Sequence, residues 1–189
     1  MIELKRIVWG ITGSGDRIEE IIDSMVEVNN FGDVKITVIV SKAGEQVLRR
    51  YNLWDKLNAN FSKVEKEVNA NVPFIAGPLQ IGKYDLFLIA PLTANSTAKI
   101  AHGIADTLIT NAIAQTLKGS TPVLVYPVDQ SSDPVTTFGP DGIEFTLIPR
   151  EVDLENVTRL KRMKGLTVLT DVSNLAQVIR NFLDHKEDS

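Results

Sequence analysis

The chain has 189 residues, of which 43% are hydrophobic and 23% charged, and its formal net charge is -4. These values predict a single globular domain over residues 1–189 with a sizeable core, and they lack the basic excess typical of nucleic-acid-binding proteins. Cysteine is absent, which excludes disulfides, thiolate zinc sites, cysteine-held iron–sulfur clusters and a cysteine nucleophile.

The sequence contains no segment typical of a secretory signal or a membrane span. Residues 1–9 include Glu3, Lys5 and Arg6 and have no long apolar stretch, unlike a signal peptide. No apolar run approaches the ~20 residues that a membrane-spanning helix needs. We therefore expect a cytoplasmic protein that makes no use of a membrane.

Short apolar segments alternate with amphipathic ones along the chain. Strands are expected at residues 6–9, 34–40, 85–90 and 123–126, with a short later strand at 145–148. Helices are expected at residues 18–28, 45–50, from 93 onward, 107–117 and 173–183. This alternation predicts an α/β fold, a Rossmann-like doubly wound parallel sheet in a three-layer αβα sandwich.

Two internal segments and the carboxyl end are less regular. Residues 51–75 are polar with scattered aromatics, and residues 128–142 are rich in serine, proline and glycine. The second segment predicts a long loop, which in a compact domain is usually functional or mobile. The charged tail at residues 184–189 is expected to fray.

Small polar residues follow three of the expected strands, at residues 10–15, 41–44 and 93–96. Because the carboxyl ends of parallel strands meet at one edge of a sheet, these residues should converge on a single crevice. Glycines let the backbone approach a phosphate, and hydroxyl groups add donors. The pattern predicts a mononucleotide site with the phosphate on the loops after the first two strands.

The glycine pattern of the first loop matches no nucleotide motif. Residues 10–15 lack the Gly-Lys-Ser/Thr ending of a P-loop, and their glycine spacing differs from that of G-x-G-x-x-G. A tight strand–helix turn explains the same glycines, and a helix cap explains Ser41. Both structural interpretations stay open beside the phosphate site.

The most informative segment is residues 91–106, P-L-T-A-N-S-T-A-K-I-A-H-G-I-A-D. The amides at the start of the following helix have no intrahelical acceptor, so they can serve a polar or anionic ligand. A plain helix start needs only one capping residue, whereas this one offers several. His102 is interpreted as a packed or surface histidine, and Asp106 either caps the next helix or holds the crevice together.

These motifs resemble the homo-oligomeric flavin-containing cysteine decarboxylase superfamily. The resemblance is carried by residues 10–14, 40–43 and above all 91–108. It implies noncovalently bound FMN and a homo-oligomer, commonly a trimer or a multiple of one. The residues expected at the cofactor, for its phosphate, ribityl chain and ring, are Gly10, Thr12, Gly13, Ser14, Ser41, Thr93, Ala94, Asn95, Ser96 and Asp106.

The features that those decarboxylases use for catalysis are missing. Residues 75–81 contain no histidine, the Pro-x-Met-Asn segment is replaced by Pro127-Val128-Asp129-Gln130, and the clamping cysteine cannot exist. These differences argue against cysteine decarboxylation. The chain is more similar to archaeoflavoproteins and acceptor-type dihydromethanopterin reductases, which use their flavin for redox chemistry.

The resemblance therefore implies an FMN-dependent oxidoreductase, acting in electron transfer or as a reductase. Its electrons would arrive from a separate carrier such as ferredoxin, or from a reduced nicotinamide or deazaflavin. Two alternatives stay open, a flavin prenyltransferase-like enzyme and a non-catalytic flavin- or nucleotide-binding protein. No acid–base catalyst is assigned, because no histidine or carboxylate in the motifs has a clear claim.

Overall fold

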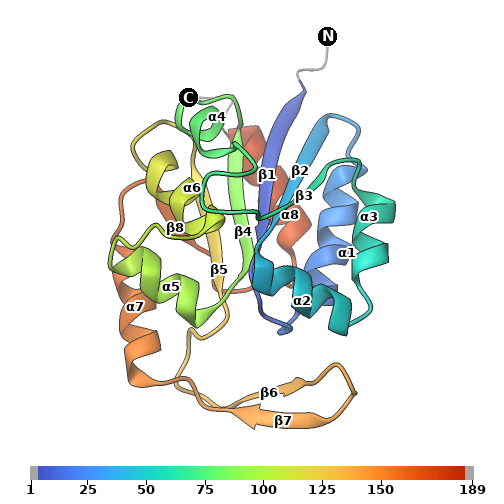
Figure 1. Cartoon of the computed structure of the whole chain (residues 1–189), viewed down its shortest axis with the longest axis vertical. Helices are drawn as coiled ribbons and strands as arrows, with labels where there is room; N and C mark the ends of the chain where they lie inside the picture. The colour runs from blue at the N-terminus through green and yellow to red at the C-terminus, as the bar shows by residue number, and fades with distance from the viewer. Residues whose placement is uncertain (1–3, 186–189) are drawn as a thin grey trace.

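The centre of the molecule is a six-stranded sheet with the strand order β3-β2-β1-β4-β5-β8 (Figure 1). The computed structural model describes residues 4–185. The strands are β1 (Lys5–Ile11), β2 (Val34–Val40), β3 (Val64–Lys66), β4 (Leu86–Leu92), β5 (Val123–Pro127) and β8 (Leu166–Val168). Every neighbouring pair is parallel. Parallel neighbours need crossover connections, and these place helices on both faces.

Helices cover the two faces in two groups. On one face, the apolar core includes residues of α1 (Ile18–Asn29), α2 (Lys42–Arg50), α3 (Trp54–Asn60) and α8 (Leu175–His185). On the other face, it includes residues of α4 (Ala76–Gln80), α5 (Ala94–Ala101), α6 (Leu108–Thr116) and α7 (Glu151–Lys161). The predicted α/β three-layer sandwich with a doubly wound parallel sheet is thereby confirmed.

The chain reverses its direction of travel across the sheet between β1 and β4. It runs from β1 outward to β2 and β3, and then returns to place β4 on the other side of β1. In such open sheets, ligands bind in the crevice outside the carboxyl ends of the strands at this reversal. The switch point, defined here as the carboxyl ends of β1 and β4 with the loops that follow them, is therefore the first place to look for a site.

The predicted long loop at residues 128–142 is wrong in part. It contains β6 (Val135–Phe138), which pairs antiparallel with β7 (Glu144–Leu147). The hairpin lies apart from the central sheet, below the ends of β4 and β5 in Figure 1. Most of its residues are exposed. A strand that is buried on neither face lacks the apolar pattern of the central strands. For this reason the sequence predicted a strand only at residues 145–148, which overlap β7, and not at β6.

Several other elements differ from the sequence-based prediction. Residues 51–75 contain α3 and β3, and α7 and β8 were not predicted at all. β3 and β8 are three-residue strands at the edges of the sheet, too short to give a clear periodicity. Of the tail expected to fray, residues 184–185 close α8, and residues 186–189 lie outside the described part.

Trp9 of β1 is a core residue that also makes a buried hydrogen bond. Its side chain is fully buried, and its Nε1 donates a hydrogen bond to the Ala90 carbonyl oxygen at 2.8 Å. Its ring meets that of Phe61 edge-on, with centroids 5.4 Å apart. Because the indole N–H has a hydrogen-bond acceptor inside the core, the buried side chain links β1 to β4.

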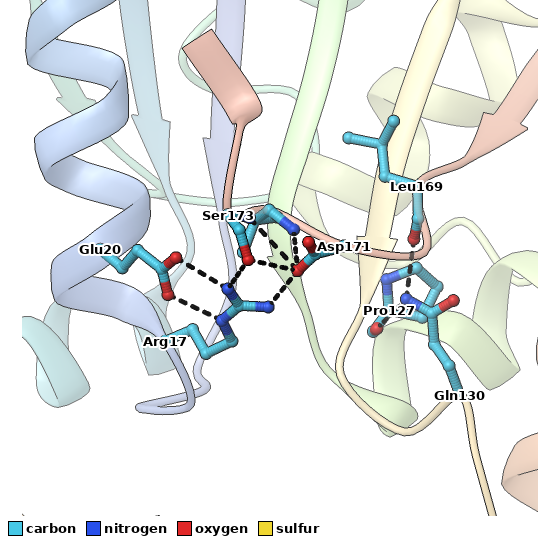
Figure 2. Close-up of polar contacts among 8 residues, drawn as sticks. Arg17, Glu20, Pro127, Gln130, Leu169, Asp171 and Ser173 are labelled. Atoms are coloured by element: carbon cyan, nitrogen blue, oxygen red, sulfur yellow. Dashed lines mark hydrogen bonds and ion pairs between the residues drawn. The ribbon is translucent and has the colours of Figure 1, made fainter. Parts of the chain in front are cut away.

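An ion pair joins the starts of α1 and α8. Figure 2 shows the Arg17 guanidinium between Glu20, Asp171 and the Ser173 hydroxyl. The Asp171 carboxylate also accepts hydrogen bonds from the backbone amides of Val172 and Ser173. Arg17 and these donors favour the charged carboxylate and hold the pKa of Asp171 well below its usual range.

Asp171→Asn should destabilise the protein in a pH-dependent way. Since 56% of the Asp171 side chain is exposed, solvent screens the pair, and we expect a loss of only about 0.5–1 kcal/mol at pH 7. The pKa of Asp171 is lower in the folded than in the unfolded state. The charged Asp171 carboxylate therefore contributes its full share to the free energy of unfolding when the pH is above about 3.9, its pKa in the unfolded state. This contribution disappears as the pH falls further. Urea unfolding of both proteins at pH 7 and pH 3 checks this: a difference that persists undiminished at pH 3 would contradict it.

Candidate functional site

Thr12 joins the two strands that part at the switch point. Its Oγ1 donates to the Pro91 carbonyl oxygen at 2.8 Å and accepts a hydrogen bond from the Thr93 amide at 2.9 Å. Its side chain is only 2% exposed. One hydroxyl group therefore fixes the loop after β1 against the loop after β4, and it does so as a buried structural contact.

The segment that follows β4 becomes the start of α5. Thr93 is the N-cap residue, and its Oγ1 accepts a hydrogen bond from the Ser96 amide at 3.2 Å. The same hydroxyl donates to Ser96 Oγ at 3.1 Å. The amides of Ala94 and Asn95 have no intrahelical acceptor, and no other acceptor for them is found within residues 4–185. The helix start thus retains free donors in addition to its own cap.

A cavity of about 220 Å³ opens beside this helix start. Its walls come from the loop after β1, the start of α5, the segment after β5 and the β6–β7 hairpin. The lining residues are Gly13, Ser14, Asp16, Thr93, Ala94, Val128, Asp129, Val135, Thr137 and Leu147. The loops after β1 and β4 contribute backbone and hydroxyl groups, whereas Val128, Val135 and Leu147 supply apolar surface.

The structure brings four of the residues expected at the cofactor into this lining: Gly13, Ser14, Thr93 and Ala94. Ser14 also turns its loop, because its Oγ accepts a hydrogen bond from the Asp16 amide at 3.2 Å. Asn95 and Ser96 occupy the same first turn of α5 but are not part of the lining, and the Asn95 side chain is exposed.

Ser41 and Gly10 have structural roles, one in capping a helix and the other in core packing. Ser41 is the N-cap of α2 and accepts a hydrogen bond from the Gly44 amide at 2.9 Å, as the capping interpretation predicts. Gly10 lies within β1, where an added Cβ would lie 3.4 to 3.6 Å from the side chains of Ile89, Ile109 and Phe87. Gly10 therefore belongs to the packing between sheet and helix and does not reach the cavity.

Asp106 lies away from the cavity, on the far end of α5. Its carboxylate accepts hydrogen bonds from Lys99 Nζ at 2.8 and 2.9 Å, and this ammonium group lowers the pKa of Asp106. The adjacent Thr107, rather than Asp106, is the N-cap of α6. His102 is the C-cap of α5. Within residues 4–185, no group of three histidine or acidic side chains is arranged to hold a metal ion.

The loops after β1 and β2 lie in direct contact at this edge of the sheet. An added Cβ at Gly13 would lie 2.6 Å from the Ala43 Cβ and 3.1 Å from the Ala43 carbonyl carbon. The Ser41 amide donates to the Ile11 carbonyl oxygen at 3.0 Å. Glycine is therefore required at position 13 for the loop that lines the cavity to rest on the start of α2.

The cavity also contains residues that the sequence did not indicate. Asp16 and Asp129 bring carboxyl groups, and the hairpin adds Val135, Thr137 and Leu147. Burial raises the pKa of both carboxyl groups; at Asp129 the carboxylates of Asp153 and Asp16 add to this effect. Two signals in the sequence pointed to this segment: Asp129 lies where the chain departs from the decarboxylase pattern, and it lies with Val135 and Thr137 in the predicted long loop at residues 128–142.

A larger hollow of about 760 Å³ lies along the outer side of α1 and shares Thr137 with the cavity. Its lining includes the acidic side chains of Glu19, Glu20, Asp23 and Glu27. Four carboxylates at this surface would repel a phosphate group. The same lining includes one cation, Arg17, which offsets only part of this negative charge. The smaller cavity has two carboxyl groups, but it lies beside the free amides at the start of α5 and is therefore the better candidate for an anionic ligand.

The family model described as Flavoprotein matches residues 1–185. The chain belongs to the flavoprotein family. It is 46% identical over 182 residues to an uncharacterized protein of Methanocaldococcus jannaschii, covering 96% of this chain and 98% of that one. The flavoprotein resemblance inferred from residues 10–14, 40–43 and 91–108 is therefore confirmed.

Two further relatives are named dihydromethanopterin reductase (acceptor). The one from M. jannaschii is 41% identical over 147 residues, and the one from Methanosarcina mazei is 37% identical over 138 residues. These alignments cover 74% and 68% of this chain but only 59% and 56% of the relatives. The chain thus spans little more than half the length of either reductase.

Solved structures of flavoproteins share the fold. Burkholderia xenovorans DmrB in complex with FMN, described as a cubic protein cage for redox transfer, has a TM-score of 0.80 and 31% identity over 97% of both chains. The FMN-dependent cysteine decarboxylase TvaF has a TM-score of 0.66 at 14% identity, covering 95% of this chain and 98% of that one. The three-layer architecture is therefore common to redox and decarboxylating members. Within the described residues, no helix is long and apolar enough to cross a membrane.

Proposed function

We propose that the chain binds FMN at the switch-point cavity and acts as an FMN-dependent oxidoreductase. The observation that carries the proposal is the composition of the cavity wall. The loops after β1 and β4 offer backbone and hydroxyl donors, and Val128, Val135 and Leu147 offer apolar surface. A flavin ring, which is flat and apolar with a polar edge, matches this combination.

The residues at the cavity fit such a cofactor in two further ways. Gly13 and Ser14 place backbone close to the ligand, and the free amides of Ala94 and Asn95 stand at the positive end of the α5 dipole. These donors favour negative charge, so they would stabilise the reduced cofactor and raise its potential. When bound, the flavin supplies the electron chemistry, and the protein supplies binding, orientation and electrostatics.

The size of the cavity supports a homo-oligomer. At about 220 Å³, it is smaller than the roughly 300–1,000 Å³ of typical cofactor sites, so a second copy of the chain would complete the pocket. The description of DmrB as a cubic cage and of an Escherichia coli UbiX-like decarboxylase as a dodecamer supports this proposal. A trimer or a multiple of it is the assembly we propose, and light scattering measures its mass.

The proposed electron donor is a reduced carrier such as ferredoxin, or a reduced nicotinamide or deazaflavin. The proposed substrate class is a dihydropterin, which the names of the two reductases support. Residues 1–189 contain no cysteine to hold an iron–sulfur cluster, which supports a separate carrier as the source of the electrons.

A visible spectrum of the purified protein, followed by anaerobic titration with reduced ferredoxin, tests the proposal. We expect flavin bands that bleach in proportion to the electrons added and return in air. Absence of flavin after incubation with FMN would overturn the cofactor assignment. A flavin that dithionite reduces but no biological donor reduces would favour the prenyltransferase-like or non-catalytic alternatives, and a prenyl phosphate added to the reduced protein separates these two.

A further inference from the structure

Two carboxyl groups face the cavity proposed for the cofactor. Asp16 comes from the loop after β1, and Asp129 comes from the segment after β5. The remaining lining residues in the described part are glycine, alanine, valine, leucine, serine and threonine. Asp16 and Asp129 are therefore the only acids or bases of useful strength in this lining, since hydroxyl groups of serine and threonine are far weaker acids.

The two carboxyl groups have different surroundings. Asp16 lies beside Arg17 and Glu20 and near Thr137 of the hairpin, and the Arg17 charge opposes the effect of burial on the pKa of Asp16. No hydrogen bond or ion pair to the Asp129 carboxyl group is found within residues 4–185, and the nearby Arg150 guanidinium is paired with Asp153. Asp129 therefore has no side-chain partner in the described residues that competes with a ligand for its proton.

The segment that carries Asp129 is held in place by its neighbour. Gln130 Nε2 donates hydrogen bonds to the carbonyl oxygens of Pro127 and Leu169 at 2.7 and 2.8 Å, as Figure 2 shows. This ties the backbone beside Asp129 to the ends of β5 and β8. A group that must meet a reacting atom needs such a fixed backbone.

The charges around Asp129 favour its neutral form. Asp153 of α7 and Arg150, the N-cap of that helix, lie near it on one side, and Asp16 lies near it on the cavity wall. The Arg150 guanidinium is already paired with Asp153, with Nη2 2.7 Å from Oδ1 and Nε 2.8 Å from Oδ2. Burial and the negative charges of Asp153 and Asp16 raise the pKa of Asp129, and the charge of Arg150 opposes them only in part.

We propose that Asp129 is the catalytic acid that protonates a substrate reduced at this cavity, a planar heterocycle with a C=N bond. Asp16 is then a positioning residue, whose negative charge acts on the substrate through Asp129. This inference rests on the proposed function, because the electrons come from the bound flavin.

Reduction of a C=N bond consumes two electrons and two protons. The bound flavin would supply a hydride to the carbon as the π bond breaks, and the Asp129 carboxyl group would give its proton to the nitrogen. The resulting carboxylate recovers its proton from water. A reduced nicotinamide restores the hydride directly, whereas a ferredoxin restores the two electrons and water supplies the accompanying proton, so the cycle balances.

Asp129→Asn removes the proton while preserving the size of the side chain. With FMN-loaded protein, we expect the rate of dihydropterin reduction to fall by about 100-fold or more, since general acids typically contribute this much. The rate with ferricyanide, a one-electron acceptor that takes up no proton, should stay within twofold. Asp129→Glu should restore part of the lost rate, and Asp133→Asn, an exposed acid of the same segment, should change neither rate.

The Asp16→Asn variant tests the positioning role through the pH profile. A catalytic acid is active below its pKa, and removal of a nearby negative charge lowers that pKa. The alkaline limb of the rate profile should therefore move to lower pH in Asp16→Asn. A carbon-13 NMR titration of the aspartate carboxyl groups in wild-type protein, assigned with Asp129→Asn, gives the pKa of Asp129 independently of turnover, and we expect it above the usual value of about 3.9.

The outcomes separate this inference from the proposed function. Wild-type protein that binds no FMN would overturn the proposed function. Wild-type protein that binds FMN and reduces a dihydropterin, with Asp129→Asn equally fast, would overturn the inference alone. Equal losses with dihydropterin and ferricyanide would also overturn it, because they indicate damage to the cofactor site. If Asp129→Asn does not fold, Asp129→Glu provides the assignment of the Asp129 signal, and an Asp129 pKa at or below the usual value of about 3.9 in the wild-type titration also overturns the inference.

Discussion

Thr12→Val should destabilise the protein by about 2 kcal/mol, although the two side chains have nearly the same shape. The substitution removes the hydroxyl group that accepts from the Thr93 amide and donates to the Pro91 carbonyl oxygen. The Pro91 oxygen keeps the Thr12 amide as a donor at 3.3 Å, but the Thr93 amide is left without an acceptor. The start of α5 should then move relative to the loop after β1, and FMN affinity should fall at least about tenfold.

Thr37→Val is the matched control for this prediction. Thr37 of β2 is buried to a similar degree, 5% against 2% exposed, and its hydroxyl group makes no hydrogen bond within residues 4–185. Urea unfolding and FMN titration of both variants provide the comparison. Equal stability and equal FMN affinity of the two variants would show that the hydroxyl group of Thr12 does not hold the switch point together.

Gly13→Ala should disturb the cavity by steric contact. The new methyl carbon would lie 2.6 Å from the Ala43 Cβ and 3.1 Å from the Ala43 carbonyl carbon, and neither belongs to a flexible side chain. The loop after β1 must therefore shift away from α2, at a cost of about 1–3 kcal/mol in the free energy of unfolding. Since Gly13 and Ser14 both line the cavity, the shift of this loop should also lower the affinity for FMN.

The double variant Gly13→Ala with Ala43→Gly provides the control. It removes the methyl group that the new side chain would contact at 2.6 Å, so part of the stability and FMN affinity should return. The two substitutions should therefore be strongly non-additive in a double-mutant cycle. Additive losses of stability and FMN affinity would contradict the proposed contact between the two loops. They would mean that Gly13→Ala acts through a contact other than the one with Ala43.

Much of the candidate site could be predicted from the sequence because its residues lie in contiguous motifs. Residues 10–14 and 91–96 each follow a run of apolar residues, and parallel strands bring the ends of such runs to one edge. These motifs predict Gly13, Ser14, Thr93 and Ala94 at the cavity, and all four line it. Gly10 begins the same glycine motif, but it lies inside β1, where its neighbours are core side chains.

The amino-acid sequence by itself determined the parallel α/β architecture and the flavoprotein family, because strand periodicity and contiguous motifs are local properties of a chain. Only the tertiary structure decided which acids meet at the cavity and what covers it. Asp16 and Asp129 come from segments far apart in the sequence, and β6 has no apolar pattern, since neither of its faces is buried. Such groups come together only through the crossovers of the sheet, so their proximity and their shifted pKa values cannot be inferred from local spacing.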